Sequence, residues 1–171
     1  ALTYATLSDA GDSAKDWTVG ASYDFKVVKV FAGYERSSNV GTSTAGTLGR
    51  AAVAAGTATG LNAIPAANGV RTETNSEWTV GVRVPVTTAG TVSASYAKNR
   101  NDIDNTDVSA WLVGYDHALS KRTTVYAAYM RLANDSASSI EPPARFNNTN
   151  TFTSATGENY SGFTVGVRHA F

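Results

Sequence analysis

Residues that could act as acid or base catalysts are few in this chain. It contains two histidines, His117 and His169, and no cysteine. His117 directly follows Asp116, and a carboxylate that orients a histidine is part of several catalytic triads. Neighbouring residues of a strand point to opposite faces, however, so Asp116 cannot orient His117 in an extended segment. We therefore expect no enzymatic activity.

The acidic segment 101–107 has the oxygen-rich composition that hard cations prefer. Its carboxylates are Asp102, Asp104 and Asp107. The segment lacks the central glycine and the distal glutamate of a calcium-binding EF-hand loop. The prediction is a solvated turn without a metal or other cofactor, and a weak surface calcium site is the alternative.

Charge and hydropathy exclude several other classes of protein. Fourteen basic and fourteen acidic residues cancel, so nothing indicates a nucleic-acid partner. The mean hydropathy is −0.19, and no segment approaches the roughly 18 to 20 consecutive apolar residues of a membrane-spanning helix. The absence of cysteine excludes disulfides and thiol catalysis.

The pattern aromatic-x-Val-Gly-x recurs four times. The copies begin at Trp17, Trp78, Trp111 and Phe163. In a strand, the aromatic residue and the valine lie on one face, and the glycine lies on the other. The copies are unequally spaced, which indicates one hairpin unit with connections of varying length rather than a fixed-period solenoid.

The C-terminal segment shows the alternation most clearly. Its apolar face carries Phe163, Val165, Val167, His169 and Phe171. An apolar band with an aromatic residue at each limit is typical of a strand that faces lipid between two aromatic girdles. On this interpretation, His169 is an amphipathic girdle residue.

The whole chain divides into eight predicted strands. Their ranges are about 1–8, 15–25, 27–37, 75–84, 91–100, 107–118, 123–133 and 160–171. Connections at 9–14, 38–74, 101–106 and 134–159 alternate with tight turns at 26, 85–90 and 119–122. Long connections at one end and tight turns at the other are typical of membrane barrels. The prediction is an all-β, antiparallel transmembrane β-barrel segment over residues 1–171, without separate domains.

The segment 114–126 and the strand 163–171 with its terminal Phe171 resemble the Gram-negative trimeric general porins of the beta-proteobacterial type. The resemblance implies the bacterial outer membrane, a homotrimer, and contacts with the lipid bilayer and lipopolysaccharide. It also implies that the outer-membrane assembly machinery recognises the apolar face of the last strand. Because such porins have about 16 strands, the chain would be the C-terminal half of the barrel, and the half with the inward-folded constriction loop would be missing. A lipopolysaccharide-bridging ion is then a further alternative for segment 101–107.

The charged residues that would line a pore follow from placing the tryptophans toward lipid. The opposite face then carries Asp24, Glu77, Arg83, Asp116 and Arg168. Aligning segment 31–36 with segment 126–131 adds Arg36 and Arg131 to the inward set. In the fifth strand, Lys98 and Arg100 are predicted to point outward at the rim, where they can reach lipid headgroups. Mutual pairing of charges in a filled interior is the alternative to a channel.

The predicted function is a water-filled channel for passive diffusion of ions and small hydrophilic solutes. The alternative is a complete eight-stranded barrel with a filled interior that acts as a structural or adhesion protein. A soluble all-β binding module is disfavoured because it would expose four apolar strips. A sheet cut from a larger barrel has open edges at its first and last strands, so we expect this chain to be unstable in a bilayer by itself.

Overall fold

The computed structural model describes residues 2–9, 12–40, 72–140 and 156–171. These residues form eight strands and no helix long and apolar enough to cross a membrane. The strands are β1 (Leu2–Asp9), β2 (Asp12–Asp24), β3 (Lys29–Val40), β4 (Thr72–Pro85), β5 (Gly90–Asn101), β6 (Val108–Ala118), β7 (Thr123–Asn134) and β8 (Tyr160–His169).

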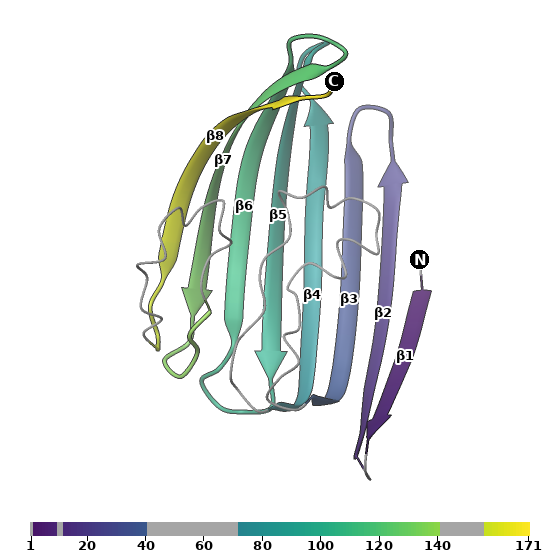
Figure 1. The fold of residues 1–171 in the computed structure, drawn as a ribbon, viewed down its shortest axis with the longest axis vertical. Coiled ribbons are helices and arrows are strands. Elements are labelled where there is room, and N and C mark those ends of the chain that lie inside the picture. Colours follow the sequence, from purple (N-terminus) through teal and green to yellow (C-terminus); the bar gives the residue numbers. More distant parts are fainter. Residues whose placement is uncertain (1, 10–11, 41–71, 141–155) are drawn as a thin grey trace.

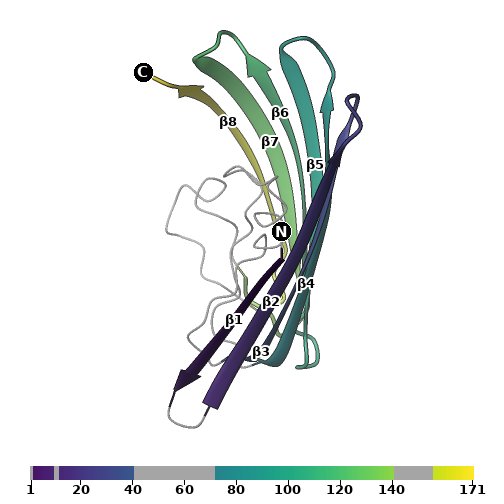
Figure 2. The ribbon, with the colours of Figure 1, turned by 90° about the vertical axis from the view of Figure 1, so that its right-hand side faces the viewer.

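The strands lie side by side in chain order, and every neighbouring pair is antiparallel (Figure 1). Within the described residues, β1 pairs with β2 and β8 pairs with β7, so the sheet is open. Figure 2 shows that the strands are tilted and that the sheet is curved, as a section of a barrel wall would be. The predicted all-β antiparallel fold is confirmed.

The strand bounds differ from the prediction by three residues at the start of β2, which begins at Asp12 inside the predicted connection 9–14, and on both sides of the predicted connection 38–74. β3 continues to Val40 and β4 begins at Thr72, because backbone pairing extends through polar partners such as Ser38 and Thr74. Residues 41–71 and 141–155, which make up most of the predicted connections 38–74 and 134–159, lie outside the described residues.

Tight turns close the other end of the sheet, where the C-terminus also lies (Figure 1). Between β2 and β3, Lys26 adopts a left-handed conformation with φ of 71°. Its amide donates to Asp24 Oδ1 over 2.7 Å, a side-chain contact that stabilises short turns. Between β6 and β7, the Ser120 hydroxyl accepts hydrogen bonds from the amides of Arg122 and Thr123 at 3.2 and 3.0 Å.

Two glycines of the repeated pattern lie beneath aromatic rings of the neighbouring strand. Gly81 is the direct partner of Phe31, and Gly166 is the direct partner of Tyr126. A Cβ atom at either glycine would overlap the ring of its partner. The glycine is therefore required for the close approach of a cross-strand ring.

Candidate functional site

The register divides the side chains between two faces, because directly opposed residues of an antiparallel pair point the same way. We call the face with Trp17, Trp78 and Trp111 the outer face. The face with Glu35 and Glu77, which are direct partners, is the inner face.

Large apolar side chains are exposed along the outer face. The exposed fraction is 44% at Val80 and 43% at Val113. On β8 it reaches 66% at both Val165 and Val167. A soluble protein rarely exposes apolar surface continuously over many strands, whereas strands that cross a bilayer must do so.

Aromatic pairs mark both limits of this apolar band. Toward the long connections, the ring pairs are Trp17 with Tyr34, Trp78 with Tyr96, and Trp111 with Tyr129. Toward the tight turns, they are Tyr23 with Phe25, Tyr115 with His117, and His169 with Phe171. Aromatic residues at two levels are the expected anchors at the two membrane interfaces.

The predicted assembly signal lies on the outer face of the last strand. Phe163 is 67% exposed and Phe171 fully so. The ring of His169 contacts Phe171 at a centroid distance of 5.0 Å, and its Nδ1 lies 2.9 Å from Thr123 Oγ1 on β7. The terminal strand thus presents one continuous apolar surface that ends in two rings.

The inner face of β2 to β4 carries two rows of charge. Near the tight turns, Asp24 is opposite Lys29 and Lys29 is opposite Arg83. Near the long connections, Glu35 is opposite Glu77, and both are 4% exposed. The sequence analysis placed Asp24, Glu77 and Arg83 on this face but missed Lys29 and Glu35. Asp24 lies on the inner face, and its partner across the β2–β3 turn is Lys29. Counting in twos along β3 from Lys29 then places Glu35 on the same face.

A third charged pair lies on the inner face of β6 and β8. Arg168 Nη2 approaches Asp116 Oδ1 at 3.9 Å, with exposed fractions of 61% and 18% for the two side chains. A contact at this distance between partly solvated groups contributes little to stability. The structure therefore brings these two predicted residues together while leaving Arg168 accessible to water.

The inward placement of Arg36 and Arg131 is wrong. Arg36 is the direct partner of Trp17, and Arg131 is the direct partner of Trp111, so both arginines are on the outer face. The physical reason is that Phe31 and Tyr126, five positions earlier, cover glycines of the inner face. Lys98 and Arg100 point outward as predicted, because their direct partners are Trp78 and Ser76.

The inner face of β6 and β7 is apolar toward the long connections, which sequence analysis did not predict. Leu112, Met130 and Leu132 are almost completely buried there. Ile140, which follows β7, packs in one cluster with Leu132, Val108 and Tyr160. The segment after β7 therefore folds onto the inner face.

The Asn134 side chain fixes this fold at the end of β7. Its Nδ2 donates to the carbonyls of Ile140 and Glu158 at 2.9 and 2.7 Å. Its Oδ1 accepts from the Ile140 amide and the Ser138 hydroxyl at 3.0 and 3.1 Å. One buried amide thus joins both ends of the connection between β7 and β8.

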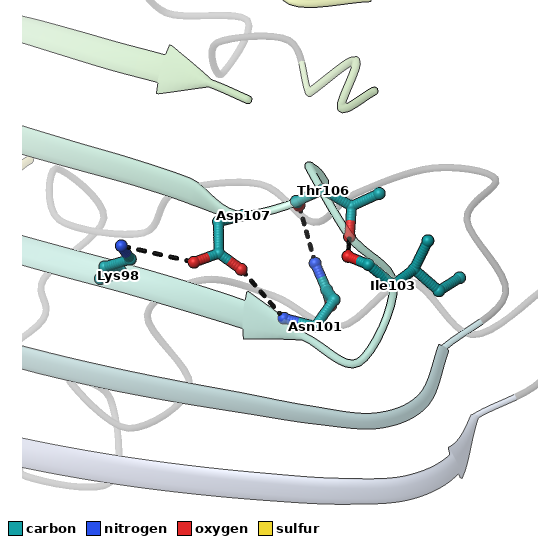
Figure 3. Close-up of polar contacts among 5 residues, drawn as sticks. All are labelled: Lys98, Asn101, Ile103, Thr106 and Asp107. Carbon is teal, nitrogen blue, oxygen red and sulfur yellow. Dashed lines mark hydrogen bonds and ion pairs between the residues drawn. The ribbon is translucent and has the colours of Figure 1, made fainter. Parts of the chain in front are cut away.

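Segment 101–107 is organised by hydrogen bonds and one ion pair (Figure 3). Asp107 Oδ2 lies 3.3 Å from Lys98 Nζ, and its Oδ1 accepts from the Asn101 amide. Asn101 Nδ2 donates to the Thr106 carbonyl over 2.8 Å. Within the described ranges, no three potential metal-ligating side chains come together. The structure therefore does not gather Asp102, Asp104 and Asp107 around a common point.

The histidines occupy the outer face. Asp116 is opposite Tyr126 on the inner face, whereas His117 is opposite Val125 on the outer face. His117 Nδ1 instead lies 2.9 Å from the Tyr115 hydroxyl. The geometry of a catalytic Asp–His pair is absent at 116–117.

Part of the chain matches a known protein family. Residues 1–137 match the family described as Gram-negative porin. A comparison with curated proteins found no match to the chain.

Proposed function

The chain belongs to the Gram-negative porin family, and on that premise we propose that it forms part of the wall of a water-filled channel for passive diffusion of ions and small hydrophilic solutes. Porins are channels of the bacterial outer membrane, and the strands of this chain are transmembrane strands. The solutes and the selectivity are the proposed part.

The observation that carries the proposal is the contrast between the two faces of β2 to β4. The outer face is apolar and exposed between two aromatic levels. On the same strands, the inner face holds Asp24, Lys29, Glu35, Glu77 and Arg83. Charges on the face turned away from lipid bias the passage of ions when water fills the interior.

The inner charges are ordered along the strands. On β4, Glu77 and Arg83 are separated by six residues, or about 20 Å at 3.3 Å per residue. Together with their partners Glu35 and Lys29, they form an acidic level toward the long connections and a basic level toward the tight turns. Arg168 and Asp116 extend the charged wall to β8. Asp24 also accepts the hydrogen bond of the β2–β3 turn.

We assign the chain to half the wall of a homotrimeric porin with about 16 strands. The open sheet supports this assignment, because the described residues of β1 and β8 pair with one neighbour each. The exposed apolar surface of β8 supports recognition by the assembly machinery through Phe163, Val165, Val167, His169 and Phe171. The surrounding partners are lipid and lipopolysaccharide.

The alternative function, a complete eight-stranded structural or adhesion barrel, would need β1 to pair with β8. The apolar cluster around Ile140 on the inner face is the feature that favours a filled interior. The charged rows of β2 to β4 lie on strands outside that cluster, and Lys29 and Arg83 of the basic row are partly exposed, which favours the channel.

Planar-bilayer recordings of the purified protein test the proposal, together with its intact mass. We expect ohmic conductance that closes in three equal steps, from a subunit of about twice the 17.9 kDa of this chain. In a salt gradient, Arg83→Gln should shift the reversal potential toward cation selectivity. Arg131→Gln removes the same charge from the outer face and should leave the reversal potential unchanged.

Folded protein with a mass near that of this chain and no conductance would instead support the filled barrel. Equal shifts for both variants would show that the effect of Arg83 is not exerted inside a channel.

A further inference from the structure

The outer face repeats one constellation in three hairpins. A tryptophan is opposite a basic residue in the pairs Trp17 with Arg36, Trp78 with Lys98, and Trp111 with Arg131. A tyrosine two residues before each basic residue stacks against the same tryptophan. The ring centroids are 5.1, 5.2 and 5.3 Å apart, and the interplanar angles are 44°, 45° and 44°.

The basic residues of the first two hairpins form a cluster. Arg36 and Arg100 are both direct partners of Ser76, so their Cα atoms are about 10 Å apart across two strand spacings. Both side chains are exposed, and neither forms an ion pair with a described residue. The small Ser76 side chain leaves the space between them open.

Lys98 lies beside this cluster but is partly neutralised. Its ammonium is paired with Asp107 at 3.3 Å (Figure 3). Asp102 and Asp104 lie farther out in the exposed connection between β5 and β6. The two arginines, together with the exposed Lys15 in the neighbouring row of β2, are therefore the cations of this surface that are available to an external anion.

An apolar groove of about 800 Å³ lies on the outer face, nearer the tight turns than the arginines. Its outer-face lining includes Ala21, Ala32, Val80, Ala94, Tyr96 and Trp111. Ala32 is four residues from Arg36 along β3, or about 13 Å toward the middle of the apolar band. A lipid whose headgroup lies on the arginines would place an acyl chain in this groove.

We propose that Arg36 and Arg100 bind a phosphate of the lipopolysaccharide lipid anchor, with an acyl chain in the groove between β2 and β6. This inference rests on the proposed porin function, because the longer connections of such barrels are extracellular and the cluster then lies in the outer leaflet. Guanidinium groups bind phosphate through paired N–H donors, and two arginines on either side of one phosphate supply a geometry that a single cation lacks. The adjacent Trp and Tyr rings lie at the headgroup level.

The third hairpin provides a matched control. Arg131 has the same tryptophan and tyrosine neighbours, but its partner on the other side is Ser161 of β8. No second arginine is in this row. Loss of Arg131 removes one positive charge from the same face, half of what the Arg36 and Arg100 double substitution removes, without removing a two-arginine site.

The test is native mass spectrometry of the purified protein titrated with bisphosphorylated lipid A in detergent. For Arg36→Gln with Arg100→Gln, we expect apparent affinity to fall roughly tenfold or more. Arg131→Gln should remain within about twofold of the parent. Dephosphorylated lipid A should bind the parent weakly and should be insensitive to the double substitution. Arg36→Lys with Arg100→Lys keeps the charges and should recover only part of the affinity.

Unchanged lipid A affinity in the double variant would overturn the site. So would an equal loss in Arg131→Gln, or equally tight binding of phosphatidylglycerol, because these results indicate generic attraction of anionic lipid. A change in oligomeric state at unchanged lipid affinity would assign the surface to subunit contact and would also overturn it. Bilayer conductance separates this inference from the channel proposal, because the double variant should conduct like the parent. A non-conducting parent that still binds lipid A through the two arginines would refute only the channel.

Discussion

The two faces of the same sheet follow different rules. On the outer face, three hairpins repeat a Trp–Tyr–cation unit with centroid distances within 0.2 Å of one another (5.1 to 5.3 Å). On the inner face, neighbouring hairpins differ: β3 and β4 hold opposed glutamates, whereas β6 and β7 hold a buried apolar cluster.

The difference reflects what each face contacts. Lipid presents the same environment to every hairpin, namely headgroups at the rim and hydrocarbon between the rims, so the same side chains recur at the same depth. The inner face contacts water and the chain itself, and each hairpin meets a different neighbour. Repetition along the sequence is therefore a signature of the lipid-facing surface.

The largest expected effect comes from placing a charge on each face of β5. Ala94 lies on the outer face between Val82 and Val113, and Thr91 lies on the inner face opposite Asp116. Ala94→Arg should lower the free energy of unfolding from lipid vesicles by about 2–4 kcal/mol. Thr91→Arg should cost less than about 1 kcal/mol, because its guanidinium reaches water and Asp116. Denaturant titration in vesicles measures both.

Equal destabilisation by the two arginines would contradict the separation of the faces. A large loss of unfolding free energy for Thr91→Arg would indicate a dry, filled interior at this level of the sheet.

The second prediction concerns the polar contact that fixes the inner cluster. Asn134→Ala removes four hydrogen bonds and leaves the Ile140 and Glu158 carbonyls without their donor. The expected loss is about 2–3 kcal/mol, since unpaired buried polar groups retain their desolvation cost. Cleavage by protease between β7 and β8 should accelerate in the folded protein.

Ser120→Ala at the opposite end of the sheet is the control. Ser120 also accepts two amide hydrogen bonds, but water replaces them at an exposed turn, so the loss should be about 0.5–1 kcal/mol. A cleavage rate for Asn134→Ala equal to that of the parent would mean that the connection is held by other contacts.

Strand positions and the lipid-facing side of β2, β4, β6 and β8 could be predicted from sequence because the period-2 pattern is local. The face on which Arg36 and Arg131 lie could not be predicted in this way, since it depends on the face to which Phe31 and Tyr126 point. By composition these rings suit lipid, yet Gly81 and Gly166 on neighbouring strands provide space for them on the inner face.

The inner apolar cluster was also inaccessible to pattern analysis. Leu112 alternates with the apolar Trp111 and Val113 of the outer face, and Met130 and Leu132 flank Arg131, so the charged side of β7 is the lipid-facing one. Of these three side chains, Leu132 is buried in the cluster with Ile140, and that contact requires the chain to turn back after β7. The proximity of Arg36 and Arg100 was likewise not predicted from the sequence. The two residues are far apart along the chain, and the strand register brings both opposite Ser76.

The third prediction concerns the Phe31 ring, which lies against Gly81 on the inner face. Gly81→Ala places a methyl group within the Phe31 ring and should cost about 1–3 kcal/mol by overpacking. Gly114→Ala meets Ser93 Oγ at 3.3 Å and should cost less than about 1 kcal/mol. Adding Phe31→Leu to Gly81→Ala should recover part of the loss. Additive effects of the two substitutions in a double-mutant cycle would contradict direct contact.

The smallest effect on stability is expected at Arg168 and Asp116 of the inner face, although both residues are proposed to influence the passage of ions. Arg168 is 61% exposed and lies 3.9 Å from Asp116, so Arg168→Gln should change unfolding free energy by less than about 0.5 kcal/mol. Its loss still removes a cation from the proposed wall, so the reversal potential should move toward cation selectivity. Asp116→Asn should move it in the opposite direction. Arg131 lies on the outer face, where its charge is proposed to contact lipid rather than the channel interior. Arg131→Gln should therefore leave the reversal potential unchanged. Identical reversal potentials for Arg168→Gln, Asp116→Asn and the parent would remove these two residues from the channel wall.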